Sequence, residues 1–373
     1  MRGLANIARF LVGVLFIFSG WVKANDTLGF SYKLIDYFEI FGTDFLIPTA
    51  LPLTIIICIF EMVAGFSLLI GARLKLTLWT LLLLILFFTF LAFYSAYFNK
   101  GTTGGGFGDA LPLSSWKSFT KDLVLLILVI ILFIGKNEIN AIFGPRLENA
   151  LLVMALIAAT VFPLYTYNYL PVVDFRPYAI GKNITAQTTG VLDELKSRSK
   201  LRDKRTGNEK ILDRLPDNYE TDYEFIEQIT EVTKKGAEAK IRDFVIYNYK
   251  GDDCTQKIIE NPNVNFLLIC ANLETVNRDA FGKINDLAIL CKQDHVKFIA
   301  LTAATKEEIE QFKKEVETDI DFYITDATIL RTMIRSNPGL MLLKGGTVQD
   351  KWHYHSLPSF TDVKQKHFKK ESR

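Results

Sequence analysis

Four cysteines are the residues of this chain that could exchange disulfides: Cys58, Cys254, Cys270 and Cys291. Exchange proceeds by attack of a thiolate on a disulfide, so it needs a second sulfur within reach. No two of the four form a CxxC pair, and none lies at metal-ligand spacing from a histidine. We expect buried, unreactive thiols and no metal site, with Cys254 the most exposed. A Cys254–Cys270 bridge stays an alternative.

An ionisable residue inside an apolar run is the second chemical signal. Glu61 lies in IIICIFEMVAGFSLLIG. A carboxylate at that depth costs about 2.5–3.5 kcal/mol, so it should face other helices and have a partner. Measured from the inner helix ends at about 1.5 Å per residue, Arg9 comes within reach of Glu61, whereas Lys23 is too far. We expect an Arg9–Glu61 pair that either locks the helices or forms a proton or ligand site. Ser19, Lys23 and Asp109 are further polar candidates.

The elements that must position these residues are apolar runs long enough to cross about 30 Å of hydrocarbon. Five runs qualify: 4–22, 47–70, 74–98, 120–136 and 148–170. They predict an all-α transmembrane bundle over residues 1–170. Positive charge is denser on the side of the N-terminus, which we therefore place in the cytoplasm. Five crossings then put the rest of the chain in the periplasm of a bacterium, so the inner membrane is the expected location.

The remaining chain is polar and divides into three parts. Residues 171–239 are expected to form a periplasmic linker or small extension, in which the charge run KSRSKLRDKRTGNEK is a solvated linker or an exposed hairpin. Residues 240–360 alternate strand and helix patterns and predict an α/β domain. Residues 361–373 form a basic tail. The net charge is only +2 and no basic stripe is interleaved with aromatic residues, so nucleic acid is not an expected partner.

Three motifs of the membrane part resemble DoxX/MauE-type membrane proteins. They are ARFLVGVLFIFSGWVKAND with Arg9, Ser19 and Lys23, EMVAGFSLLIG with Glu61, and FGDALPLSSWKSFTKD with Asp109. LPVVDFRPYAIGKNI further resembles the exit of the last helix in Bacteroidota members. The resemblance covers most of residues 1–185. It implies a four-helix core plus one extra helix, and membrane-linked thiol or quinone redox work.

One loop departs from that family pattern. Many relatives carry C-G-C-F-G-D where this chain has GGGFGD, so the family cysteines fall on Gly104 and Gly106. Glycine supplies neither a nucleophile nor a leaving group, so the resemblance implies a loop that has lost its chemistry. An ordinary flexible loop is the alternative. We therefore expect no catalytic residue at this loop.

The α/β part resembles a thioredoxin-like domain, because NPGLMLLKGGTVQDKWHYH places Pro338 where that fold has its cis-proline. The loop after the strand NFLLICANL lacks CxxC, which implies a redox-inactive domain. Ala271, Asn272, Asn337 and Pro338 should then line a groove that holds extended polypeptide by strand addition. His353 and His355 alternate on the last predicted strand, where an exposed sheet face is favoured over a metal site.

Two function classes follow from these patterns. The favoured one is a non-catalytic binding, assembly or accessory subunit of a membrane complex. Its expected partners are inner-membrane or periplasmic proteins, extended polypeptide and the bilayer, and no cofactor is expected. The alternative is a DoxX/MauE-type redox accessory that uses the cysteines of a partner or a quinone. A proton or solute pathway through Glu61 is a weaker third reading, because one carboxylate makes no relay.

Overall fold

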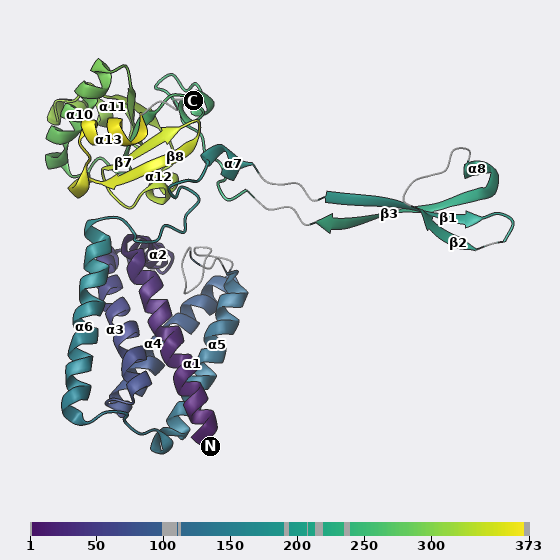
Figure 1. Ribbon diagram of the computed structural model, residues 1–373, viewed down its shortest axis with the longest axis vertical. Coiled ribbons are helices and arrows are strands. Elements are labelled where there is room, and N and C mark those ends of the chain that lie inside the picture. The colour runs from purple at the N-terminus through teal and green to yellow at the C-terminus, as the bar shows by residue number, and fades with distance from the viewer. Residues whose placement is uncertain are drawn as a thin grey trace.

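The structure is a computed structural model that describes residues 2–98, 110, 113–189, 194–206, 208–212, 219–234 and 239–368. A helical bundle carries an α/β domain at one end, and a narrow sheet extends sideways from that domain (Figure 1). The N-terminus lies at the opposite end of the bundle from the α/β domain (Figure 1). The predicted fold class, a helical membrane region followed by a region of sheets and helices, is confirmed.

The bundle contains five long helices among the described residues. They are α1 (Arg2–Asn25), α3 (Ala50–Ile70), α4 (Leu74–Phe98), α5 (Ser115–Ile134) and α6 (Pro145–Asn168). Four stretches are long and apolar enough to cross a membrane: Gly3–Asn25, Asp44–Ile70, Leu74–Phe98 and Pro145–Asn168. The expected crossing at 120–136 corresponds to α5, which falls outside this set because Lys117, Lys121 and Asp122 occupy its first turns. It nevertheless packs along α4 inside the bundle.

A further helix, α2 (Thr27–Ile40), was not expected. The side chain of Asp26 caps it by accepting a hydrogen bond from the Gly29 amide at 3.0 Å. α2 lies at the end of the bundle that faces the α/β domain (Figure 1). Short 3₁₀ helices, η1 (Asp44–Thr49) and η3 (Lys136–Glu138), complete this part.

The α/β domain is built on a five-stranded sheet in the order β6-β5-β4-β7-β8. Strands β4, β5 and β6 are parallel, and β7 and β8 are antiparallel to their neighbours. The strands are β4 (Asn265–Cys270), β5 (Lys297–Thr302), β6 (Asp321–Ile324), β7 (Gly339–Lys344) and β8 (Thr347–His353). Every residue of β4 is buried, because cores cover both faces of the sheet.

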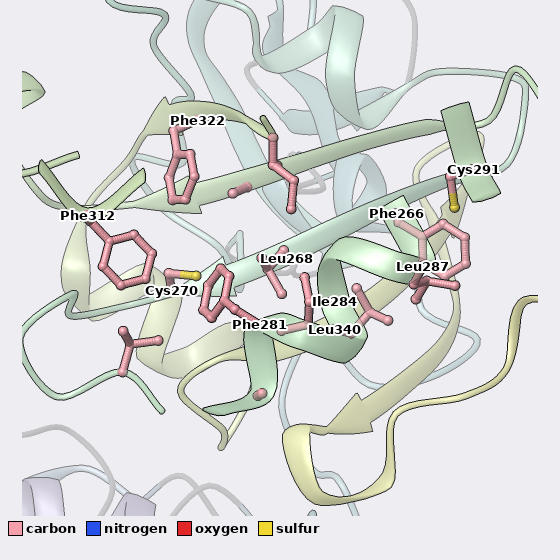
Figure 2. Close-up of a cluster of buried hydrophobic side chains, with 14 of the residues drawn as sticks. Phe266, Leu268, Cys270, Phe281, Ile284, Leu287, Cys291, Phe312, Phe322 and Leu340 are labelled. Atoms are coloured by element: carbon pink, nitrogen blue, oxygen red, sulfur yellow. The ribbon is translucent and has the colours of Figure 1, made fainter. Parts of the chain in front are cut away.

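Helices and short turns surround this sheet. They are α9 (Thr255–Ile259), η4 (Arg278–Ala280), α10 (Phe281–Gln293), α11 (Lys306–Glu315), α12 (Ala327–Met333), η5 (Tyr354–Ser356) and α13 (Phe360–His367). A capping box formed by Thr305 and Glu308 starts α11. Figure 2 shows the core on the α10 side of the sheet, where Phe281 packs against Phe312 and Phe266 lies beside Leu287 and Cys291.

Two expectations for this half need correction. The alternating residues IRDFVIYNY at 241–249 predict a strand, which is absent from the described structure because Asp243 has a φ of 55° and the segment pairs with β6 only through Tyr247. Residues 361–368 of the expected basic tail belong to the α/β domain, because α13 buries Val363 in its core. The stretch 171–239 contains α7 (Ile184–Thr188), α8 (Tyr219–Asp222) and the antiparallel sheet β2-β1-β3.

The charge run of that stretch forms the hairpin that was one of the two expectations. Its strands are β1 (Glu194–Asp203) and β2 (Glu209–Leu212), and β3 (Tyr223–Lys234) pairs along the other edge of β1. This small sheet is the extension seen at the side of Figure 1.

Candidate functional site

A buried ion pair joins α1 to α3 in the half of the bundle nearer the α/β domain. The Lys23 ammonium donates to Oε1 of Glu61 at 2.5 Å, and the two side chains are only 3% and 1% exposed. Lys23 also donates to Oγ of Ser19 at 2.9 Å and lies 3.9 Å from the centre of the Phe88 ring. The ring face stabilises the cation, and the hydrogen bonds offset part of its desolvation. Oε2 of Glu61 has no hydrogen-bond partner among the described residues.

The expected Arg9–Glu61 pair is therefore wrong. Arg9 instead donates to the carbonyls of Leu68 and Leu69, at 2.9 and 2.7 Å. These carbonyls belong to the last turn of α3, where helical amides run out and only the Leu68 carbonyl is also reached by the C-cap amide of Gly71, at 3.1 Å. Arg9 thus caps a helix end and has no contact with the buried carboxylate.

The register between α1 and α3 explains the error. The two helices approach at glycines, so that an added Cβ at Gly65 would lie 2.7 Å from the carbonyl oxygen of Gly13. An added Cβ at Gly20 would lie 3.0 Å from Cβ of Glu61. Glu61 is thus opposite Gly20, about 16 Å along α1 from Arg9. Counting residues from the helix ends gave the wrong offset between α1 and α3. The positions of the glycines indicate the correct one.

A second charged pair, Lys121 and Asp122 of α5, lies beside the first. Their Nζ and Oδ1 atoms are 2.6 Å apart, and Asp122 is buried. Ser19, Lys23, Glu61, Lys121 and Asp122 all line one small cavity with otherwise apolar walls. Ionisable residues gathered inside a membrane bundle mark a candidate functional site. Two cations and two carboxylates balance its charge.

A larger cavity lies next to this cluster, between α1, α2, α4, α5 and the segment that follows α6. Its volume is about 80 Å³. Its apolar lining includes Phe30, Leu34, Phe88, Leu91 and Val173. Its polar lining includes Lys23, Asp26, Tyr37, Ser118, Asp122, Asp174 and Arg176.

Two acids of that lining also join the bundle to the α/β domain. Asp26, at the start of α2, receives two hydrogen bonds from the Arg335 guanidinium, at 2.8 and 2.9 Å. Asp174 receives two from Arg176, at 2.7 and 2.9 Å, and one from Lys351 of β8 at 2.8 Å. Such paired, forked contacts hold a fixed geometry. We call these five residues the joint.

Burial and charge act against each other in the joint. Burial would raise the pKa of Asp26, but the Arg335 guanidinium outweighs it and holds the pKa well below its usual range. Burial also acts to raise the pKa of Asp174, but the nearby charges of Arg176 and Lys351 lower it, and the net effect is a lowered pKa. Burial and the neighbouring Arg176 lower the pKa of Lys351 to about 7, although Asp174 opposes them. Sequence reasoning missed the joint, although the motif VVDFRPY contains two of its residues.

The residues of the groove expected in the α/β domain lie together, but they form hydrogen bonds with one another and with Asn277. The Asn337–Pro338 peptide bond is cis, as expected from the position of Pro338. Nδ2 of Asn337 donates to the carbonyl of Asn272 at 2.7 Å, so the two predicted segments meet, and Ala271 precedes Asn272 at the end of β4. The Asn337 carbonyl, however, already accepts a hydrogen bond from the Asn277 amide at 3.0 Å.

All four cysteines of the chain are free. Cys58, Cys270 and Cys291 are buried and Cys254 is partly exposed, as expected, and no Cys254–Cys270 bridge exists. Figure 2 shows Cys270 and Cys291 among the aromatic and aliphatic side chains of the core. Burial raises the pKa of both thiols, that of Cys291 to about 12. These thiols are therefore poor nucleophiles.

The two histidines at the end of β8 do not share an exposed face. His353 is 2% exposed and ends the strand, and burial lowers its pKa to about 4. His355 lies in η5, and its Nδ1 is 2.7 Å from the carbonyl oxygen of Asn168 in α6. The pair thus contributes to the contact between bundle and domain. No group of three metal-ligating side chains occurs within the described ranges.

The loop positions Gly104, Gly106 and Asp109 lie outside the described residues. Nothing in the structure therefore bears on the expectation that this loop has lost its chemistry.

Fold and site together define a helical membrane protein with a polar cluster inside its bundle and an α/β domain at one end. Residues 1–135 match the family model described as Methylamine utilisation protein MauE. This part of the chain is thus similar to the MauE family, in agreement with the DoxX/MauE resemblance of its motifs. The match includes Ser19, Lys23 and Glu61 and ends just after α5. No curated protein and no solved structure matches the chain.

Proposed function

We propose that this protein is a non-catalytic binding or assembly subunit of a membrane complex, with a redox-inactive thioredoxin-like domain on the outer side of a bacterial inner membrane. The thioredoxin-like assignment rests on the sheet order, on the mixed strand directions and on the cis-proline before β7. One observation carries the proposal: three of the four sulfurs are buried and none is paired. The chain therefore offers no thiol pair for exchange.

The end of β4 supports the same conclusion. The side chain of Asn272 accepts hydrogen bonds from the amides of Glu274 and Thr275, at 2.8 and 3.1 Å. The position where the fold's nucleophile would be expected is thus occupied by a self-bonded turn. We propose that extended polypeptide reaches Pro338 only when Asn277 releases the Asn337 carbonyl.

The proposed orientation rests on charge. Arg73 and Lys136 lie in the α3–α4 and α5–α6 connections, and Lys75 and Arg146 lie in the first turns of the helices that follow them. Both connections are at the same end of the bundle as the N-terminus. An excess of Lys and Arg in short loops marks the cytoplasmic side. Alkaline phosphatase fused after residue 373 should therefore be active, and an inactive, stable fusion would reverse the orientation.

The test of the function is a crosslinked pull-down from the native membrane. A tagged chain should capture defined membrane or periplasmic proteins, and Arg335→Gln, which breaks the joint, should reduce their yield. Lys292→Gln is the control, since its pair with Asp319 is exposed and neither residue belongs to the joint or to the expected groove. Equal capture by the untagged control and the tagged chain would refute an assembly role.

A second candidate, a redox accessory that uses the thiols of a partner, is favoured by the partial exposure of Cys254. Quinone stays a proposal for that alternative alone. Acid-trapping of thiols in cells, followed by mass tagging, separates the two functions. A mixed disulfide on Cys254 that Cys254→Ser abolishes would support the accessory.

A further inference from the structure

We infer that the larger cavity is a binding site for a neutral, ring-sized amphiphile whose body is apolar and whose head is a hydroxyl or carbonyl. The inference goes beyond the proposed assembly role and is independent of it. It rests on the size of the cavity, on its lining and on one unpartnered hydroxyl.

The size sets the scale of the ligand. The volume of the cavity is about 80 Å³. A single water needs about 10–15 Å³ on this measure, so the space holds several waters or one small ring. The walls of Phe30, Leu34, Phe88 and Leu91 favour an apolar body over water, because an apolar surface offers water no hydrogen bonds.

The unpartnered hydroxyl points to the head group. Ser118 lines the cavity, is only 1% exposed, and its Oγ has no hydrogen-bond partner in the described chain. A buried hydroxyl without a partner is costly, so a ligand that bonds to it gains affinity. Tyr37 and Ser95 are further hydroxyls of the same lining.

The charges of the lining favour a neutral ligand. Asp26 and Asp174 are paired with the cations of the joint, and Asp122 is paired with Lys121. Lys23 is paired with Glu61. Lys33, the other charged residue of the lining, is only partly buried and has an interaction of its own. A charged ligand would have to compete with these interactions or stay uncompensated at low dielectric.

Photolabelling tests the site. The probe is an alkylphenol that carries a diazirine, applied to the full-length protein in nanodiscs, and the labelled peptides are mapped by mass spectrometry. Label should appear on α2 and α4 segments that line the cavity. 4-Ethylphenol should compete at a concentration about fivefold lower than ethylbenzene, the effect expected of one hydrogen bond. 4-Ethylbenzoate, which is charged, should not compete.

Variants link the label to the cavity. Ala92→Phe fills the lining and should abolish the label, whereas Ala158→Phe on the exposed face of α6 should leave it unchanged. Ser118→Ala should keep the label but remove the advantage of 4-ethylphenol over ethylbenzene. Label that is unaffected by Ala92→Phe in a normally abundant protein, or strongest competition by 4-ethylbenzoate, would overturn the inference.

Discussion

The ion pair between Lys23 and Glu61 yields the sharpest prediction, because each partner is almost fully buried. Glu61→Gln leaves a buried ammonium with only neutral acceptors, the Ser19 hydroxyl and the new amide carbonyl, and Lys23→Met leaves a buried carboxylate. Breaking a buried pair by removal of one partner costs about 3–5 kcal/mol. Removal of both charges is often close to neutral, so the double variant should lose no more than about 3 kcal/mol.

The assay is a double-mutant cycle. Unfolding of the purified protein is followed in mixed micelles as the fraction of denaturing detergent rises. The sum of the single effects should exceed the effect of the double variant by about 3 kcal/mol or more. Arg9→Gln serves as control, and its effect should add to that of Glu61→Gln, because these residues have no contact. Additive effects of Lys23→Met and Glu61→Gln, or strong coupling between Arg9 and Glu61, would refute the described register.

Three further predictions concern the joint and the glycine contact. Arg335→Gln should leave Asp26 without its cation and increase protease cleavage between the bundle and the α/β domain, and an unchanged cleavage rate would contradict the role of the joint. Gly65→Ala should lower the free energy of unfolding by about 1–3 kcal/mol, because the added methyl group overpacks the contact between α1 and α3. Gly282→Ala is the control: its methyl group meets no atom within 4 Å, so the free energy of unfolding should rise by about 0.5–1 kcal/mol. The pKa of Lys351 is lowered to about 7. Above pH 7 the Lys351 side chain therefore keeps its proton in the unfolded chain but loses it in the folded one. The free energy of unfolding should then rise between pH 7 and about 10. Lys351→Met should remove most of this rise when melting is measured as a function of pH.

The long helices could be predicted because their signal is local. An apolar run such as 74–98 can satisfy its backbone in a membrane only as a helix, and α4 has those bounds. Helix α2 was missed because its polar and apolar residues alternate in a short stretch that resembles a loop. Its start signal, the cap by Asp26, was present but was counted as loop charge.

The site was harder to predict because it depends on register and on contacts between distant segments. Lys23 meets Glu61 only because glycines bring α1 and α3 together at one offset. Asp26 meets Arg335 across 309 residues of sequence, which no local pattern reports. The cis-proline was expected from the thioredoxin-like resemblance, and the unpaired cysteines were expected because no two of them form CxxC.

The central claim is that this protein acts through contact and without its own sulfurs. The most direct test is a chain in which Cys58, Cys270 and Cys291 become alanine and Cys254 becomes serine, crosslinked and purified from the native membrane beside the wild type. We expect the same partners in the same yield at equal abundance. Loss of those partners from the cysteine-free chain, at normal abundance and melting temperature, would contradict the claim.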